Sequence, residues 1–189
     1  MSIPETTNVP ESISDALLVE RALRERQRFG ALYERYADRL YRYALQRCAT
    51  SEEADDVVSD TMLAALETLH RYDPGRGSFA AWLFTIAARR AADQYRGRAR
   101  FRRALSRRRH DLPPADETSE AVLRRADYHA VRAGLAKLSE SDRELLLLRY
   151  AAELSAREIG EILHITDANA RVRLQRARQR LAVHLGEST

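Results

Sequence analysis

The stretch from Leu154 to Leu181 constrains the fold of this chain most, because it predicts two short helices joined by a very tight turn. Ser155 precedes the first helix and Glu158 follows three residues later, which is the spacing of a capping box. Thr166 is suited to cap the second helix, because its side-chain oxygen can accept a hydrogen bond from the backbone three residues on. A short helix, a tight turn and an Arg-rich second helix together predict a helix-turn-helix.

The second helix of this motif has two unlike faces when its residues are placed at about 100° per position. Its narrow inward stripe consists of Ala170, Leu174, Ala177 and Leu181. Its first turn and outer side carry groups that can read base edges, since Arg can bind guanine in a bidentate way. The candidate residues of this surface are Thr166 at the cap, Ala168, Asn169, Arg171, Val172, Gln175 and Arg176, with Arg173 on the flank, where it suits phosphates. The alternative is a solvated basic helix in an ordinary bundle.

Composition favours a helical protein with a polyanionic partner. Of 189 residues, 32% are charged and only 7 are Gly and 5 Pro, and no strand pattern interrupts the helical periodicity. The net charge is only +4, but Arg residues cluster at 96–109 and at 171–180. Clustered Arg favours nucleic acid as the partner, although each cluster alone could be a solvated face.

Several classes of protein and site are disfavoured. Cys48 is the only cysteine, so the chain can form no internal disulfide and no zinc site from thiolates. No apolar run approaches the roughly 20 residues needed to span a bilayer, and the N-terminus does not resemble a signal peptide. We therefore expect a cytoplasmic protein without membrane insertion, and we expect no metal and no cofactor.

The chain divides into two predicted helical domains joined by a flexible linker, an all-α organisation. Residues 1–13 are expected to be disordered, 14–106 to form the first domain and 119–186 the second, which contains the helix-turn-helix. Residues 107–118 are the linker by composition, with two adjacent prolines and a switch from Arg to acidic residues. Within the first domain, helical periodicity runs from about Ser14 to Cys48 without an obvious break.

Two further features of the first domain carry functional groups. Thr50 and the acids after it predict the start of a helix, one face of which stays acidic through Asp56 and Asp60. The next connection, residues 70–77, contains one proline and two glycines and is predicted to be a loop. Ser78 then caps a helix whose apolar stripe includes Trp82 and whose polar face becomes increasingly basic.

Three segments, taken in this order and spacing, resemble the extracytoplasmic-function (ECF) sigma factors of bacterial RNA polymerase. Residues 54–63 resemble the helix by which that family binds the core polymerase. Residues 79–87, followed by Asp93 and Arg96, resemble its −10-reading helix, and residues 138–181 resemble its −35-reading domain. One departure is His164 in the turn before the last helix, where the family usually has Gly.

The resemblance implies a role for each matching position. The implied core-polymerase contacts are Asp56, Val57, Ser59, Asp60 and Thr61. The implied −10 contacts are Tyr72, Arg76, Ser78, Trp82, Arg89, Arg90 and Arg96. The loop would hold a base flipped out of the non-template strand, because aromatic and guanidinium planes stack on unpaired bases. The candidate residues of the second helix would read the −35 element.

The leading hypothesis is therefore an alternative sigma factor that binds core RNA polymerase and promoter DNA and assists promoter melting. The resemblance also implies an anti-sigma factor as a third partner, clamped between the two domains. The main alternative is a stand-alone helix-turn-helix regulator, which would leave the first domain unexplained. An enzyme is disfavoured, because the five His residues are scattered and no nucleophile–base pair, phosphate loop or metal-binding spacing occurs.

Overall fold

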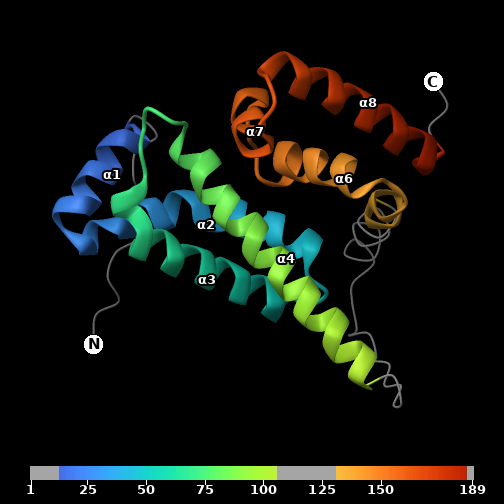
Figure 1. Ribbon diagram of the computed structural model, residues 1–189, viewed down its shortest axis with the longest axis horizontal. Helices are drawn as coiled ribbons and strands as arrows, with labels where there is room; N and C mark the ends of the chain where they lie inside the picture. The colour runs from blue at the N-terminus through green and yellow to red at the C-terminus, as the bar shows by residue number, and fades with distance from the viewer. Residues whose placement is uncertain (1–12, 106–130, 187–189) are drawn as a thin grey trace, which may run out of the picture.

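The computed structural model describes residues 13–105 and 131–186, with side chains for 13–94 and 131–186. Within these ranges every regular element is helical, as predicted (Figure 1). The first part contains α1 (Asp15–Arg24), η1 (Arg26–Phe29), α2 (Gly30–Arg47), α3 (Ser51–Thr68), η2 (Leu69–Arg71) and α4 (Phe79–Leu105). The second part contains helical residues 131–137, α6 (Glu140–Leu146), the wide π turn η3 (Leu147–Ala151), α7 (Ala156–Leu163) and α8 (Asp167–Leu185). Most of the predicted disordered N-terminus, the predicted linker 107–118 and residues 119–130 lie outside the described residues.

The helical periodicity predicted from Ser14 to Cys48 is interrupted at Glu25. Glu25 has extended backbone angles (φ −142°, ψ 105°), so α1 ends there and a short 3₁₀ segment leads into α2. The break lets α1 pack beside α2, where Asp15 accepts hydrogen bonds from Arg35 (2.7 Å) and Tyr36 (2.5 Å). The prediction missed this break because the apolar positions on both sides of it keep helical spacing.

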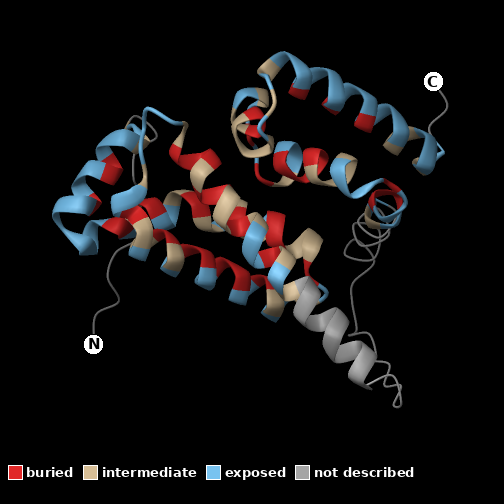
Figure 2. Ribbon diagram, viewed as in Figure 1, coloured by how far each residue is buried: buried red, intermediate tan, exposed pale blue. Residues whose placement is uncertain are grey.

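Helices α2, α3 and α4 form the main layer of the first part, and their buried faces point toward one another (Figure 2). Tyr36, Tyr43 and Phe84 are among the largest fully buried side chains there. Thr50 caps α3 by accepting a hydrogen bond from the backbone of Glu53 at 3.2 Å, as its sequence position predicted. The ring of Tyr43 meets Phe84 edge-on, which is a favourable arrangement for two buried aromatic rings.

The helix-turn-helix forms as predicted. Ser155 and Glu158 make both hydrogen bonds of the capping box, and Thr166 caps α8 through the N–H of Asn169 at 3.2 Å. His164 ends α7 in the left-handed conformation (φ 55°, ψ 44°), the conformation for which Gly is the usual choice.

The predicted inward stripe of α8 is confirmed. Ala170, Leu174 and Ala177 are buried, and Leu181 is partly buried against the same core. The far end of α8 is tied to α6 by an ion pair between Arg180 and Asp142 at 2.6 Å. Arg180 therefore has a partner within the protein, which the sequence did not indicate.

The two parts share one hydrophobic core. Leu148, Leu154 and Ile159 of the second part belong to the same buried cluster as Tyr36 and Phe84 of the first part. Helix α4 packs against α7, and α2 packs against η3. In Figure 1, α6, α7 and α8 lie on one side of α2 and α4, while α3 lies on the other side.

Candidate nucleic-acid and polymerase interface

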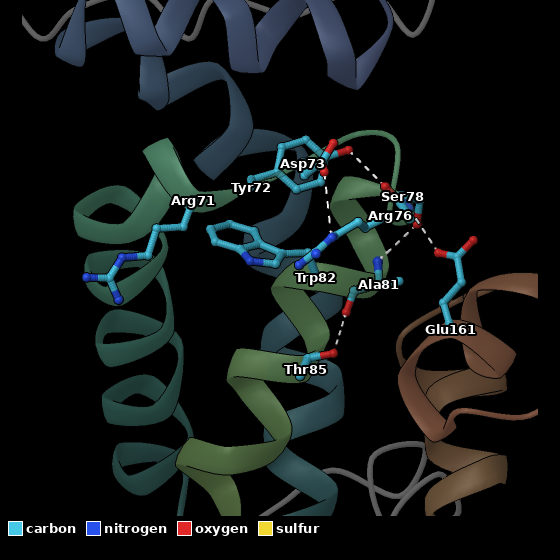
Figure 3. Close-up of a pocket in the computed structure, with 10 residues that line it drawn as sticks. Arg71, Tyr72, Asp73, Arg76, Ser78, Ala81, Trp82, Thr85 and Glu161 are labelled. Atoms are coloured by element: carbon cyan, nitrogen blue, oxygen red, sulfur yellow. Dashed lines mark hydrogen bonds and ion pairs between the residues drawn. The ribbon is translucent and has the colours of Figure 1, made fainter.

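A pocket of about 290 Å³ lies where the loop after η2 meets the first turns of α4 (Figure 3). It is lined by Arg71, Tyr72, Asp73, Arg76, Gly77, Ser78, Ala81, Trp82, Thr85 and Glu161. The Tyr72 ring lies 5.5 Å from both Phe79 and Trp82, and its hydroxyl donates to the Gly77 carbonyl at 3.1 Å. These contacts hold the aromatic wall in place, so the pocket has a preformed flat side of the kind that stacks on a base.

Four of the predicted −10 residues meet at this pocket. They are Tyr72, Arg76, Ser78 and Trp82. Arg76 is highly exposed and forms a loose surface pair with Asp73 at 3.7 Å. Burial raises the pKa of the Tyr72 hydroxyl, so this group stays protonated and able to donate hydrogen bonds well above neutral pH.

Ser78 caps α4 as predicted. Its hydroxyl accepts from the Ala81 N–H at 3.1 Å, and its carbonyl accepts from the Trp82 N–H at 3.1 Å. Its own N–H donates to the Glu161 carboxylate of α7 at 2.9 Å. The positive end of the α4 dipole therefore faces the pocket mouth, where it favours negatively charged groups.

The basic face of α4 continues from the pocket. Arg89 lies seven positions after Trp82, nearly two helical turns, and so falls on the same side of the helix. Arg89 and Arg90 are both exposed. Arg96 lies within α4, but its side chain lies outside the described residues.

The acidic face of α3 divides the predicted core-polymerase residues into two groups. Asp56, Ser59 and Asp60 are exposed. Val57 and Thr61 are buried, with exposed fractions of 2% and 0%, so their side chains cannot contact a partner in this arrangement. The core-polymerase contact of all five residues stays a prediction, and of these Asp56, Ser59 and Asp60 present their side chains at the surface.

Leu63 belongs to the exposed face of α3 and was not among the predicted contacts. It is 53% exposed and lies three positions after Asp60 and seven after Asp56, which places all three on one side of the helix. This spacing was visible in the sequence. The acidic face therefore combines two carboxylates with one exposed aliphatic side chain.

All eight predicted −35 residues are exposed on α8 or at its cap. Arg171 pairs with Asp167 at 2.5 Å and Arg173 donates to Asn169 at 3.1 Å, so these two guanidinium groups are oriented by their own helix. Val172 is 46% exposed, which gives the face an apolar contact point.

A groove of about 630 Å³ borders this face. It is lined by Arg149, Tyr150, Ser155, Ala156, Arg157, Asp167, Arg171, Leu174, Gln175 and Arg178. Arg149, Tyr150 and Arg157 are exposed. All three precede α8 in the chain, so a helical wheel of that helix could not identify them. Within residues 13–105 and 131–186, no group of three or more His, Cys, Asp and Glu side chains is placed to hold a metal ion.

Two groups at the first pocket were also missed. Thr85 lines it from the second turn of α4, and Glu161 reaches it from α7. The spacing of Trp82 and Thr85 on one helical face would have found the first. The sequence contained only an indirect signal for Glu161. Glu158 and Glu161 are two carboxylates three positions apart on the first helix of a motif that is otherwise basic.

Two features define an all-helical DNA-binding protein. A preformed aromatic pocket lies beside a basic helix, and the second helix of the helix-turn-helix is Arg-rich and exposed. A family model for sigma-70 region 2 matches residues 32–101, and one for sigma-70 region 4 matches residues 128–181.

Curated relatives give the same result. The ECF RNA polymerase sigma factor SigL of Mycobacterium tuberculosis is 30% identical over 175 residues, covering 93% of this chain and 96% of SigL. The ECF sigma factor BldN of Streptomyces coelicolor is 33% identical over 153 residues, covering 77% of this chain and 56% of BldN. The chain belongs to the ECF family of RNA polymerase sigma factors, which confirms the expected family and makes it an alternative sigma factor of transcription initiation.

Solved structures confirm the fold. CnrH, solved in complex with the cytosolic domain of CnrY, superposes with a TM-score of 0.70 at 28% identity, covering 93% of this chain and 99% of CnrH. The sigma factor RpoE of Bartonella quintana, solved with the anti-sigma factor NepR, gives a TM-score of 0.64 at 24% identity, covering 85% of this chain and 98% of RpoE. In the described part of the chain, no helix is both long enough and apolar enough to cross a bilayer.

Proposed function

We propose that this sigma factor binds core RNA polymerase through the exposed face of α3 and reads two promoter elements through the α4 pocket and α8. The observation that carries the proposal is the pairing of an aromatic pocket at the start of a basic helix with an exposed reading face on a helix-turn-helix. The chain itself would have no catalytic role, since the polymerase makes the transcript. It would act in the cytoplasm, where polymerase and promoter DNA are found.

The proposed polymerase contact is formed by Asp56, Ser59, Asp60 and Leu63. The carboxylates would steer the chain to a basic surface, and the aliphatic side chain would be buried on docking. Val57 and Thr61 would support this face from within by holding α3 against α2 and α4.

The proposed −10 site is the pocket between Tyr72 and Trp82. A base that leaves the duplex loses stacking worth roughly a few kcal/mol, and an aromatic wall can restore about 1–3 kcal/mol of it. Arg89 and Arg90 would follow the phosphates of the same strand, and Arg96 is proposed to extend this track.

The proposed −35 site is the outer face of α8. Arg171, Gln175 and Arg176 carry the donors that suit base edges in the major groove. Thr166, Ala168, Asn169, Val172 and Arg173 would complete the contact at the helix start and flank. Arg149 and Arg157, beside the groove, suit the neighbouring phosphates.

An inhibitory partner protein is also proposed. CnrH, which shares 28% identity, was solved with a cytosolic domain of another protein bound to it. A small protein that covers both parts of this chain would block polymerase and DNA together. Co-purification from the native cell tests this, and the absence of any stoichiometric partner would contradict it.

The decisive test is transcription from a promoter library by core polymerase with and without the purified chain. We expect discrete new start sites that share two sequence elements. Sequence-specific DNA binding without any new transcript would favour the alternative, a stand-alone helix-turn-helix regulator.

The contact on α3 is tested by Asp56→Lys with Asp60→Lys in a pull-down with core polymerase. Association should fall sharply, since repulsion replaces attraction at two positions. Asp38→Lys, which reverses an exposed carboxylate on α2, is the matched control and should leave association near the wild-type level.

A further inference from the structure

The centre of the α8 reading face is an aliphatic side chain. Val172 lies two positions after Ala170 and two before Leu174, and both of these neighbours are buried. At about 100° per position, Val172 therefore points almost directly away from the core. It is 46% exposed, and the exposed Ala168 lies one helical turn before it on the same side. The outward side of α8 is exposed along the helix, so nothing within the described part of the chain covers this apolar centre (Figure 2).

The long side chains on either side of Val172 are held along the helix. Arg171 donates to the Asp167 carboxylate at 2.5 Å, and the Arg173 Nε donates to the Asn169 side-chain oxygen at 3.1 Å. Each acceptor lies four positions before its arginine, so both guanidinium groups run toward the start of α8 and leave the Val172 methyl groups accessible. A valine in a helix has one strongly preferred rotamer, so these methyl groups also have a defined position.

Val172 lies in the part of α8 that would enter the major groove. Recognition helices contact base edges through residues near their N-terminus. Val172 is the sixth residue of α8 and lies about 8 Å along the axis from Asp167, close to Asn169 and Arg171. Val183, the second valine of α8, is 71% exposed but lies about 24 Å from Asp167. Val172 is therefore placed to meet a base, whereas Val183 is not.

The chemistry of Val172 selects among the four bases. Its methyl groups can neither donate nor accept a hydrogen bond. Thymine is the base that presents a methyl group in the major groove, whereas adenine and cytosine present amino groups and guanine presents two acceptors. A polar base edge covered by Val172 would lose water without gaining a partner, which is unfavourable. The 5-methyl group of thymine would instead gain an apolar contact.

We propose that Val172 determines specificity within the −35 element by contacting the 5-methyl group of a thymine. The inference rests on the function proposed above, because that function places α8 in the major groove of this element. It adds one base of the element and the chemical group by which that base is recognised.

The test uses the holoenzyme assembled from core polymerase and the full chain. Its duplex promoter is taken from the start sites mapped above. Each thymine of the −35 element, on either strand, is replaced in turn by deoxyuridine, which lacks only the 5-methyl group. Competition binding against the unmodified promoter then measures what each methyl group contributes.

One deoxyuridine substitution is expected to weaken binding roughly three- to fivefold, the effect of one buried carbon group. Replacing the same T·A pair by C·G should also weaken binding. A 5-methylcytosine at that position should recover roughly three- to fivefold of this loss, because it restores the methyl group on a different base.

Two protein variants connect this effect to Val172. Val172→Ser removes both methyl groups from an exposed position, so its holoenzyme should bind the thymine and deoxyuridine promoters equally well. Val183→Ser makes the same change at the other exposed valine of α8 and is the matched control. It should keep the full discrimination against deoxyuridine.

Four outcomes would overturn the inference. These are a −35 element without thymine, equal binding of every deoxyuridine promoter by the wild-type holoenzyme, no recovery with 5-methylcytosine, and undiminished discrimination by Val172→Ser. A holoenzyme that makes no promoter-directed transcripts would instead contradict the proposed function, so the two failures are distinguishable.

Discussion

The contact of Tyr43 with Glu144 gives the sharpest test of how the two halves are joined. The Tyr43 hydroxyl donates to the Glu144 carboxylate at 2.7 Å, and Arg47 pairs with the same carboxylate. The side chains of Arg47 and Glu144 are each only 14% exposed, so water screens the pair weakly. Removing Glu144 leaves Arg47 with Glu140, which is 68% exposed, and leaves the tyrosine hydroxyl without its acceptor.

The expected magnitudes follow from these contacts. Tyr43→Phe should cost about 1.5 kcal/mol of unfolding free energy, the low end for a hydrogen bond to a charged group. Glu144→Ala should cost about 3 kcal/mol, the low end for breaking a buried pair, because Glu140 remains near Arg47. The double variant should cost less than the sum by about 1–2 kcal/mol, since both single changes remove the same hydrogen bond.

The assay is urea denaturation of the full chain and its three variants, followed by circular dichroism. The matched control is the Glu20–Arg24 pair, whose side chains are 54% and 79% exposed and which should show a coupling of at most about 0.5 kcal/mol. Additivity of Tyr43→Phe and Glu144→Ala within about 0.5 kcal/mol would refute the reasoning, because it would mean that the two halves do not touch in solution.

Three further predictions concern stability. Burial raises the pKa of Tyr43 to about 12, so the folded state keeps a proton that the unfolded state loses above about pH 10. The free energy of unfolding should therefore fall by up to roughly 2.7 kcal/mol between pH 10 and 12. Tyr43→Phe should flatten that part of a series of denaturation curves measured across pH. Gly160→Ala would place a Cβ 2.6 Å from the Ile165 carbonyl oxygen and should destabilise the protein by about 1–3 kcal/mol in thermal melts. Gly30→Ala is the control: a Cβ there has nothing within 4 Å, so this variant should be neutral or slightly stabilising. His164→Gly should stabilise the turn by up to about 1 kcal/mol, because the left-handed backbone there strains any residue with a Cβ; an unchanged or lower melting temperature would contradict this.

Local signals in the sequence were read reliably wherever one short segment decides the outcome. The caps at Thr50, Ser155 and Thr166 formed as predicted, because each depends on a backbone N–H only three residues away. The inward stripe of α8 was also predictable, since helical spacing alone places Ala170 and Leu174 on one side.

The tertiary structure adds what the sequence did not indicate where two segments pack against the same residue. Val57 and Thr61 match the family segment that contacts polymerase, but packing of α3 on α2 and α4 buries them. Glu25 breaks a helix whose apolar spacing continues on both sides, and α1 packs beside α2, where Asp15 contacts Arg35 and Tyr36. The helical spacing of α3 separates its two faces, whereas the break at Glu25 leaves no signature within a window of a few residues.

The sequence by itself determined the all-helical class, the helix-turn-helix, the family and the positions of the basic and acidic faces. These follow from periodicity, capping and side-chain charge, which act over one or two helical turns. Only the tertiary structure decided that Glu161 lies at Ser78, 83 residues away, and that Glu144 meets Tyr43 across 101 residues. Such pairs depend on how whole helices stack around a shared core, which no local pattern specifies.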